Sequence, residues 1–285
     1  MRPLESIELF SGAGGLALGL HDAGFRHRAL FEWNASAVQT LQYNQQKGHP
    51  SLRECGIFRA DVREVDFKPF RGVDLVSGGP PCQPFSMGGK AAGMNDARDM
   101  FPQAVRAVAE AQPMAFIFEN VRGLLRPAFS NYVEFIRLQM EFPDFPISQN
   151  ASWDQNLARL QRHKESLGDK WTGLRYRVHV HQANAADYGV PQQRHRVFFI
   201  GFRSDIITDW SFPKPTHADG ATFSGLLPWR PLSSALEGLP PPTQSPSQKW
   251  SNHILQPGAK VYPGHTGGRG PPSEVMIMGP PLGRG

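Results

Sequence analysis

The chain has 285 residues, of which 40% are hydrophobic and 19% are charged, a composition typical of a globular protein with one large domain or a large and a small one. It contains no apolar run of the roughly 18 residues that span a membrane, and its N-terminus lacks the apolar core of a signal peptide. Two cysteines exclude a disulfide framework and, without histidines at metal-ligand spacing, a structural zinc site, while the net charge of +5 indicates a nucleic-acid partner only weakly. We therefore expect a cytoplasmic protein without a membrane or metal partner.

The first residues have the pattern of a nucleotide-binding strand, turn and helix. A short apolar strand over 6–10 leads into the glycine-rich segment 11–15, and an amphipathic helix over 16–24 follows. The glycines allow the backbone to approach a ligand, and the helix N-terminus offers free N–H groups. A second strand over 29–33 carries Glu32 roughly 20 residues after the turn, where such folds place an acid that binds ribose hydroxyls. The alternative is an ordinary exposed acid at the end of a strand.

The alternation of strands and helices continues to about residue 202 and predicts an α/β fold with a Rossmann-like sheet covered by helices on both faces. Asp61 lies near the end of an expected strand over 57–62 and is a candidate acceptor for an adenine amino group. We expect further strands over 73–77, 113–121, 174–183 and 197–202, with helices over 35–46, 100–111, 132–140 and 153–167. The last two strands are expected to form an antiparallel pair at the sheet edge.

The strand over 73–77 leads into the sequence Ser-Gly-Gly-Pro-Pro-Cys-Gln-Pro-Phe-Ser, in which Cys82 is the central residue. A thiol on a rigid loop at the carboxyl end of a strand is placed as a nucleophile would be, although a lone cysteine is commonly a small buried hydrophobe. Glu119 ends the neighbouring apolar strand, where a carboxylate is costly to bury unless it is paired or used. The alternative for Glu119 is a structural, salt-bridged acid.

Basic residues are frequent between 159 and 203, and this stretch is either a phosphate-contacting surface or an ordinary solvated face. Prolines then interrupt the chain repeatedly, so we place a domain boundary near 210. The expected domains are 1–210, which binds a nucleotide-like cofactor and carries the candidate nucleophile, a small domain begun by 211–263, and a Gly/Pro-rich tail over 264–285. The basic residues are Arg159, Arg162, Lys164, Lys170, Arg175, Arg177, Arg194, Arg196 and Arg203.

Taken together and in order, these motifs resemble the cytosine-5 DNA methyltransferase family over residues 5–202. The resemblance implies S-adenosyl-L-methionine as cofactor, held by Phe10, Gly12, Ala13, Gly14, Gly15, Glu32, Trp33, Asp61 and Pro80. It implies catalysis by Cys82, Glu119, Arg194 and Arg196, and contacts to DNA by Pro81, Gln83, Ser86, Arg98 and Asn120. The segments that carry it are Phe10–Gly15, Gly78–Gln83, Glu119–Val121 and Gln192–Arg196.

The family chemistry explains why these residue types are needed. The C5 atom of cytosine is a weak nucleophile until a thiolate adds to C6, a role that the resemblance gives to Cys82. Glu119 would act at N3, and Arg196, with Arg194, would hold the O2 side and orient Glu119. A duplex hides C6, so the cytosine in double-stranded DNA must be flipped out of the helix.

The resemblance weakens towards the C-terminus. Residues 251–267 are similar to the start of the family's later region, but the final family motif is not recognisable. We therefore expect the larger chain of a split modification methyltransferase of a restriction-modification system, with a second polypeptide supplying target recognition. The alternatives are a catalytically incomplete chain that binds cofactor or DNA, and a tRNA cytosine-5 methyltransferase. Intact Cys82, Glu119 and Arg196 argue against the incomplete chain.

Overall fold

A computed structural model describes residues 2–81, 99–167, 173–206, 209–220, 225–238, 243–244 and 254–255. The chain divides into two compact units, one formed by Met1–Asn184 with His195–Lys214 and the other by Ala185–Arg194 with Pro215–Gly285. The segment 185–194 thus groups with the residues from Pro215 onward, across the intervening segment 195–214.

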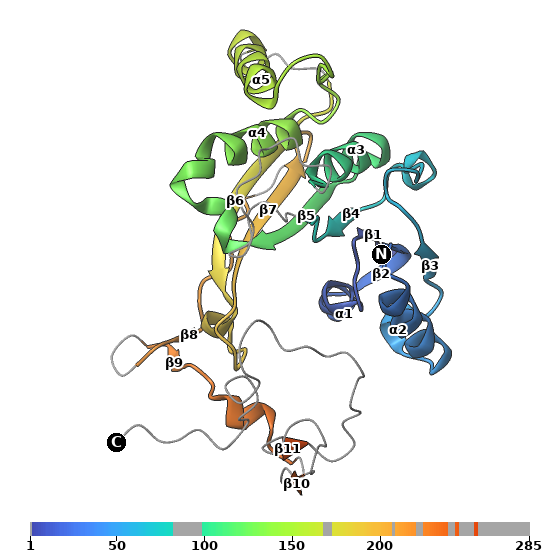
Figure 1. Ribbon diagram of the computed structural model, residues 1–285, viewed down its shortest axis with the longest axis vertical. Coiled ribbons are helices and arrows are strands. Elements are labelled where there is room, and N and C mark those ends of the chain that lie inside the picture. Colours follow the sequence, from blue (N-terminus) through green and yellow to red (C-terminus); the bar gives the residue numbers. More distant parts are fainter. Residues whose placement is uncertain are drawn as a thin grey trace. The chain divides into compact units, whose positions relative to one another are not determined.

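A seven-stranded sheet forms the centre of the first unit, in the order β3-β2-β1-β4-β5-β7-β6 (Figure 1). The strands from β3 to β5 are parallel, whereas β7 runs antiparallel to both β5 and β6. This topology confirms the predicted Rossmann-like α/β fold and the antiparallel pair at its edge. The strands are β1 Leu4–Leu9, β2 Phe25–Glu32, β3 Gly56–Arg59, β4 Leu75–Gly78, β5 Ala115–Val121, β6 Tyr176–Asn184 and β7 His195–Arg203.

Helices cover both faces of this sheet, with α1 and α2 on one side and α3 and α4 on the other (Figure 1). The two faces have separate buried clusters. Leu30 packs with Leu41 beneath α1 and α2, whereas Ile7 and Phe116 belong to the larger core on the side of α3 and α4. The longest described helix, α5, packs on the outside of α4. The helices are α1 Gly15–Asp22, α2 Ala35–Gln46, α3 Phe101–Ala111, α4 Ser130–Glu141 and α5 Trp153–Leu167.

Local sequence explains where these helices start and stop. The side chain of Asn34 caps α2 by accepting from the backbone N–H groups of Ser36 at 2.9 Å and Ala37 at 3.1 Å. Just before α3, the side chain of Asp99 accepts from the backbone N–H of Phe101 at 3.1 Å. Gly24 follows the end of α1 with a φ of 94°, a left-handed conformation that favours glycine.

The second unit is described only in part. Its strands are short: β8 His217–Ala218 pairs with β9 Leu227–Pro228, and β10 Thr243–Gln244 pairs with β11 Ile254–Leu255. Within this unit the indole N–H of Trp229 donates to Asp187 at 2.9 Å, which ties the segment 185–194 to the residues after β9.

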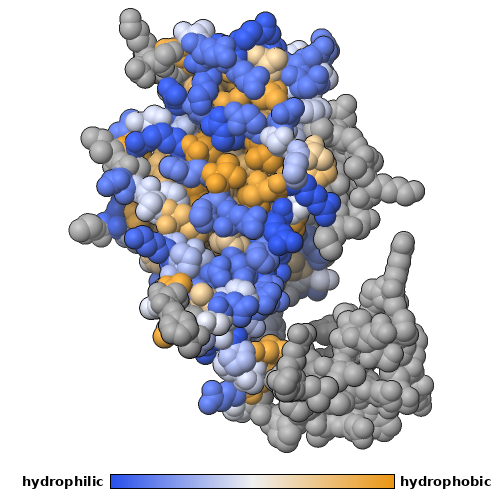
Figure 2. Space-filling view, turned by 90° about the vertical axis from the view of Figure 1, so that its left-hand side faces the viewer, coloured by the Kyte–Doolittle hydropathy of each residue, from blue (hydrophilic) through white to orange (hydrophobic). Residues whose placement is uncertain are grey.

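The surface carries hydrophobic residues as well as charged ones. On the side viewed in Figure 2, hydrophobic residues gather in the middle and hydrophilic residues surround them. The most exposed of the large hydrophobic side chains in the described part of the chain is Trp33, at 67%. None of the helices that the structure describes is long and apolar enough to cross a membrane.

Candidate active site

The glycine-rich turn after β1 has a backbone that few residues adopt. Gly12 and Gly14 have φ values of 54° and 90°, and Phe10 reaches 56° without being a glycine. A Cβ atom on Gly14 would lie only 2.8 Å from Cδ2 of Leu41, so a side chain there would collide with α2. A strained, closely packed turn at the carboxyl end of a strand is a common feature of ligand sites.

Glu32, the last residue of β2, holds this turn in place. Its Oε2 accepts from the backbone N–H of Gly12 at 2.8 Å, and its Oε1 accepts from the N–H of Asn34 at 2.7 Å. A carboxylate has about four acceptor positions, so two hydrogen bonds leave it able to bind hydroxyl groups of a ligand. Glu32, roughly 20 residues after the turn in the sequence, thus contacts the turn directly.

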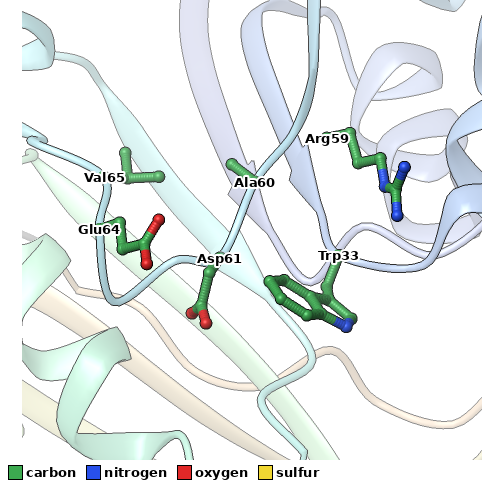
Figure 3. A pocket seen from close by; sticks show the side chains of 6 residues that line it. All are labelled: Trp33, Arg59, Ala60, Asp61, Glu64 and Val65. Carbon is green, nitrogen blue, oxygen red and sulfur yellow. The ribbon is translucent and has the colours of Figure 1, made fainter.

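Two adjoining cavities lie beside Trp33 and Asp61, and Glu32 lines the smaller one. The smaller has a volume of about 340 Å³, and the larger, of about 510 Å³, shares Trp33, Ala60 and Asp61 with it (Figure 3). Apolar and aromatic walls with a few carboxylates suit a ligand that has a flat ring and hydroxyl groups. The smaller cavity is lined by Phe10, Phe31, Glu32, Trp33, Ala60, Asp61, Val62, Arg63, Gly79, Pro81 and Met100.

One expectation about the residues that line these cavities was wrong. The strand predicted over 57–62 ends at Arg59, so Asp61 does not lie on β3 but in the turn that follows it. Hydrogen bonding to Arg63 holds the pKa of Asp61 below its ordinary value. Sequence reasoning also missed Arg63 and Met100 as cavity residues. The spacing of Asp61 and Arg63, two residues apart in a turn, was an available signal for the first of them.

The loop after β4 is held against its neighbours before it reaches Cys82. The buried side chain of Asn120 donates to the carbonyl oxygen of Pro80 at 3.0 Å, which makes it a support of this loop. Pro81 borders the smaller cavity, and its carbonyl oxygen accepts from the N–H of Met100 at 3.4 Å. The predicted site residues Cys82, Gln83, Ser86 and Arg98 lie outside the described residues.

Glu119 and Arg196 form an ion pair across the antiparallel strands β5 and β7. The register places Phe198 opposite Glu119, so Arg196 reaches the carboxylate diagonally, and its Nη1 also donates to the carbonyl oxygen of His195 at 2.8 Å. Both side chains keep partial exposure, 30% for Glu119 and 21% for Arg196. Arg194, predicted to assist, belongs to the second unit and is exposed.

The basic stretch from 159 to 203 is largely engaged within the protein. The buried carboxylate of Glu141 pairs with Lys164 at 2.8 Å and with Arg175 at 3.0 Å, and also with Arg137. Arg203 pairs with Asp205, as Arg196 does with Glu119. Lys164 and Arg175 therefore serve the packing of α4, α5 and the residues before β6. Other arginines of the described stretch, Arg162, Arg177 and Arg194, are exposed.

No group of three or more potential metal ligands occurs among the described His, Cys, Asp and Glu residues. The polar groups of the site are instead carboxylates paired with backbone N–H groups or arginines.

Comparison with known proteins places these features in one family. The family model of the C-5 cytosine-specific DNA methylases matches residues 4–151 and 156–234. The type II methyltransferase M.NgoMIV of Neisseria gonorrhoeae is 35% identical over 222 residues, which cover 78% of this chain and 59% of that protein. The type II methyltransferase M.AquIA of a Picosynechococcus species is 32% identical over 256 residues, covering 83% of this chain and 89% of that protein.

A solved structure shares the fold. The crystal structure of a prophage-encoded protein from Escherichia coli, described as a DNA modification methyltransferase, superposes with a TM-score of 0.55 at 28% identity. The superposition covers 83% of this chain and 55% of that one. The chain therefore spans little more than half the length of this protein and of M.NgoMIV, but most of the length of M.AquIA.

Proposed function

Because this chain belongs to the C-5 cytosine-specific DNA methylase family, we propose that it transfers a methyl group from S-adenosyl-L-methionine to C5 of cytosine in double-stranded DNA. One observation carries the proposal beyond family membership. The cavity between the glycine turn and Asp61 is bordered by Pro81, the residue directly before Cys82. A ligand in this cavity would therefore lie next to the start of the nucleophile loop.

The residues of the cavity fit the proposed cofactor. Trp33 and Phe31 offer ring surfaces to an adenine, Asp61 offers an acceptor for its amino group, and Glu32 keeps acceptor positions for the ribose hydroxyls. The backbone of the turn from Phe10 to Gly14 is where the remainder of the cofactor would lie. When bound, the cofactor supplies a methyl group on a positively charged sulfur.

The side chains at the ends of β4, β5 and β7 would act on the base. The thiolate of Cys82 adds to C6, and Glu119 donates a proton or hydrogen bond at N3, so that electron density moves to C5. C5 would then take the methyl group, with the cofactor sulfur leaving as a thioether. Removal of the C5 proton by a base, return of the N3 proton to Glu119 and expulsion of the Cys82 thiolate would restore the aromatic ring. Arg196 holds Glu119 through their ion pair and offers further donors to the O2 side of the base.

The proposal extends to the biological role of the chain and to a partner protein. M.NgoMIV and M.AquIA are both called type II methyltransferases, which supports a role in a restriction-modification system in the cytoplasm. We further propose that recognition of the target sequence depends on a second polypeptide. The support is that the family match ends at residue 234, before the family-like segment 251–267 and the Gly/Pro-rich residues after it.

Covalent trapping tests the function most directly. Duplex DNA that contains 5-fluorocytosine cannot lose the C5 substituent, so it should remain bound to Cys82 when S-adenosyl-L-methionine is present. We expect a denaturation-resistant adduct on electrophoresis with the wild-type chain, tested alone and with the product of the neighbouring reading frame. Cys82→Ser should form no adduct but should retain S-adenosylhomocysteine binding.

The controls separate the parts of this proposal. Cys55→Ser removes the other cysteine, which is buried beneath α1 and α2, and should leave the adduct intact. An adduct formed with fluorinated tRNA and not with duplex DNA would contradict the proposed substrate. Full sequence-specific methylation by the purified chain alone would contradict the second polypeptide only.

A further inference from the structure

Asp61 occupies a critical place in the candidate cofactor site. Its side chain is only 9% exposed and borders both cavities together with Trp33 (Figure 3). Because Asp61 lies two residues past the end of β3, the ladder of the sheet does not fix it. Another interaction must therefore hold its carboxylate in one orientation.

Arg63 provides that interaction. Its Nε donates to Oδ1 of Asp61 at 3.0 Å and to Oδ2 at 2.9 Å, its Nη2 contacts Oδ2, and its backbone N–H donates to Oδ1 at 3.0 Å. The guanidinium of Arg63 thus makes a bidentate contact, here called the fork, with the carboxylate of Asp61. Such a contact fixes the orientation of the carboxylate as well as its distance. Between them, Val62 is buried and anchors the turn.

The contacts of Arg63 leave a defined part of the carboxylate available. The backbone N–H, the Nε–H, which both oxygens share, and the Nη2–H of Arg63 are three donors, whereas a carboxylate has about four acceptor positions, so one position remains. A donor that enters from the cavity can use this remaining position without displacing Arg63. The exocyclic amino group of a 6-aminopurine is such a donor.

We propose that Arg63 is a positioning residue for the cofactor, which holds Asp61 so that its free acceptor meets the 6-amino group of the adenine ring. This inference rests on the proposed function, because it assumes that the cavity binds an adenine nucleoside. Arg63 itself is 53% exposed. An exposed ion pair commonly adds little to stability, so its value here lies in orienting Asp61.

Binding calorimetry with two ligands tests the role. The ligands are S-adenosylhomocysteine and the analogue whose purine lacks the 6-amino group. Arg63→Ala should weaken binding of S-adenosylhomocysteine by about tenfold, the loss typical of a charge-assisted hydrogen bond, and binding of the analogue by less than about twofold. Arg63→Lys keeps the charge without the fork and should fall between Arg63→Ala and the wild type.

Further variants show whether Arg63 acts through Asp61. In an Asp61→Asn background, Arg63→Ala should have no additional effect on either ligand, because the fork is already lost. Arg71→Ala removes an exposed arginine outside both cavities and serves as the charge-matched control.

Two results would overturn the inference. If Arg63→Ala weakens both ligands equally, or neither, while the wild-type chain binds S-adenosylhomocysteine, Arg63 does not position Asp61 and the proposed cofactor still stands. If the wild-type chain does not bind S-adenosylhomocysteine, the proposed cofactor fails and this inference fails with it. Thermal melts of each variant ensure that only folded protein is compared.

Discussion

At the scale of single residues, the first strand carries a buried acid that the proposed chemistry does not use. Glu8 on β1 is 1% exposed, and the hydroxyl of Ser77 donates to its Oε2 at 3.4 Å. Burial raises the pKa of Glu8 to about 8, although the hydrogen bonds from Ser77 and from the backbone of Ala17 oppose the rise. Near neutral pH this side chain is therefore mostly protonated in the folded protein.

The stability of the protein should depend on this proton. The pKa of Glu8 is higher in the folded chain than its ordinary value of 4.5, so its contribution to stability is full below about pH 4.5, declines as pH rises and is lost above about pH 8. In urea unfolding between pH 5 and 8, the free energy of unfolding of the wild type should fall relative to that of Glu8→Gln by up to about 1.4 kcal/mol per pH unit. A constant difference between the two proteins across this range would contradict the prediction.

At the scale of the elements, the approach of β4 to β1 places the loop that leads to Cys82. A Cβ atom on Gly78 would lie 2.4 Å from the carbonyl oxygen of Leu9, closer than any real contact. Gly78 therefore allows the last residue of β4 to pair with β1 and lets Gly79 and Pro81 reach the cavity. The requirement is for close approach, since Gly78 has no positive φ.

Replacement of Gly78 should lower the stability of the protein, whereas replacement of an exposed glycine in a helix should not. Gly78→Ala should lower the free energy of unfolding by about 1–3 kcal/mol, because the strands must separate to admit the methyl group. Gly19→Ala on α1 is the control, since its Cβ would meet nothing within 4 Å, and it should be neutral or stabilising by up to about 1 kcal/mol. Urea titration measures both values, and equal stabilities of the two variants would refute the explanation.

At the scale of the whole molecule, the net charge of +5 does not show where cations are available to a partner. Glu141 on α4 forms ion pairs with Arg137 of α4, Lys164 of α5 and Arg175, which lies just before β6. Burial alone would raise the pKa of Glu141, but its cation partners outweigh that effect and hold the pKa below its ordinary value. These charges stabilise the packing of the outer helices.

This assignment predicts how substitutions in the basic stretch separate stability from DNA binding. Arg175→Gln should lower the free energy of unfolding by about 1–3 kcal/mol, because the buried Glu141 loses one of its cation partners, and should leave the affinity of the folded protein for duplex DNA nearly unchanged. Arg162→Gln, on the exposed face of α5, should change stability by less than about 0.5 kcal/mol. Lost DNA affinity with unchanged stability in Arg175→Gln would contradict the prediction, with fluorescence anisotropy as the measurement.

The sequence by itself determined the order of strands and helices, the glycine turn with its acid at Glu32, and the membership of the family. These features depend on local periodicity and on motif spacing, which can be recognised from the amino-acid sequence alone. It also singled out Glu119 and Arg196 as candidate catalytic residues, from resemblance and not from their pairing, and this role stays a prediction.

Only the tertiary structure decided which charges meet. The diagonal contact of Arg196 with Glu119 depends on the register of two antiparallel strands. The ion pairs of Glu141 likewise join residues that are far apart in the chain. Strand periodicity also did not predict that β3 ends at Arg59. For this reason the structure alone showed that Asp61 lies in the following turn and pairs there with Arg63. The reason is physical: propensity and periodicity act over a few residues, whereas ion pairs are selected by distances that exist only after the sheet has formed.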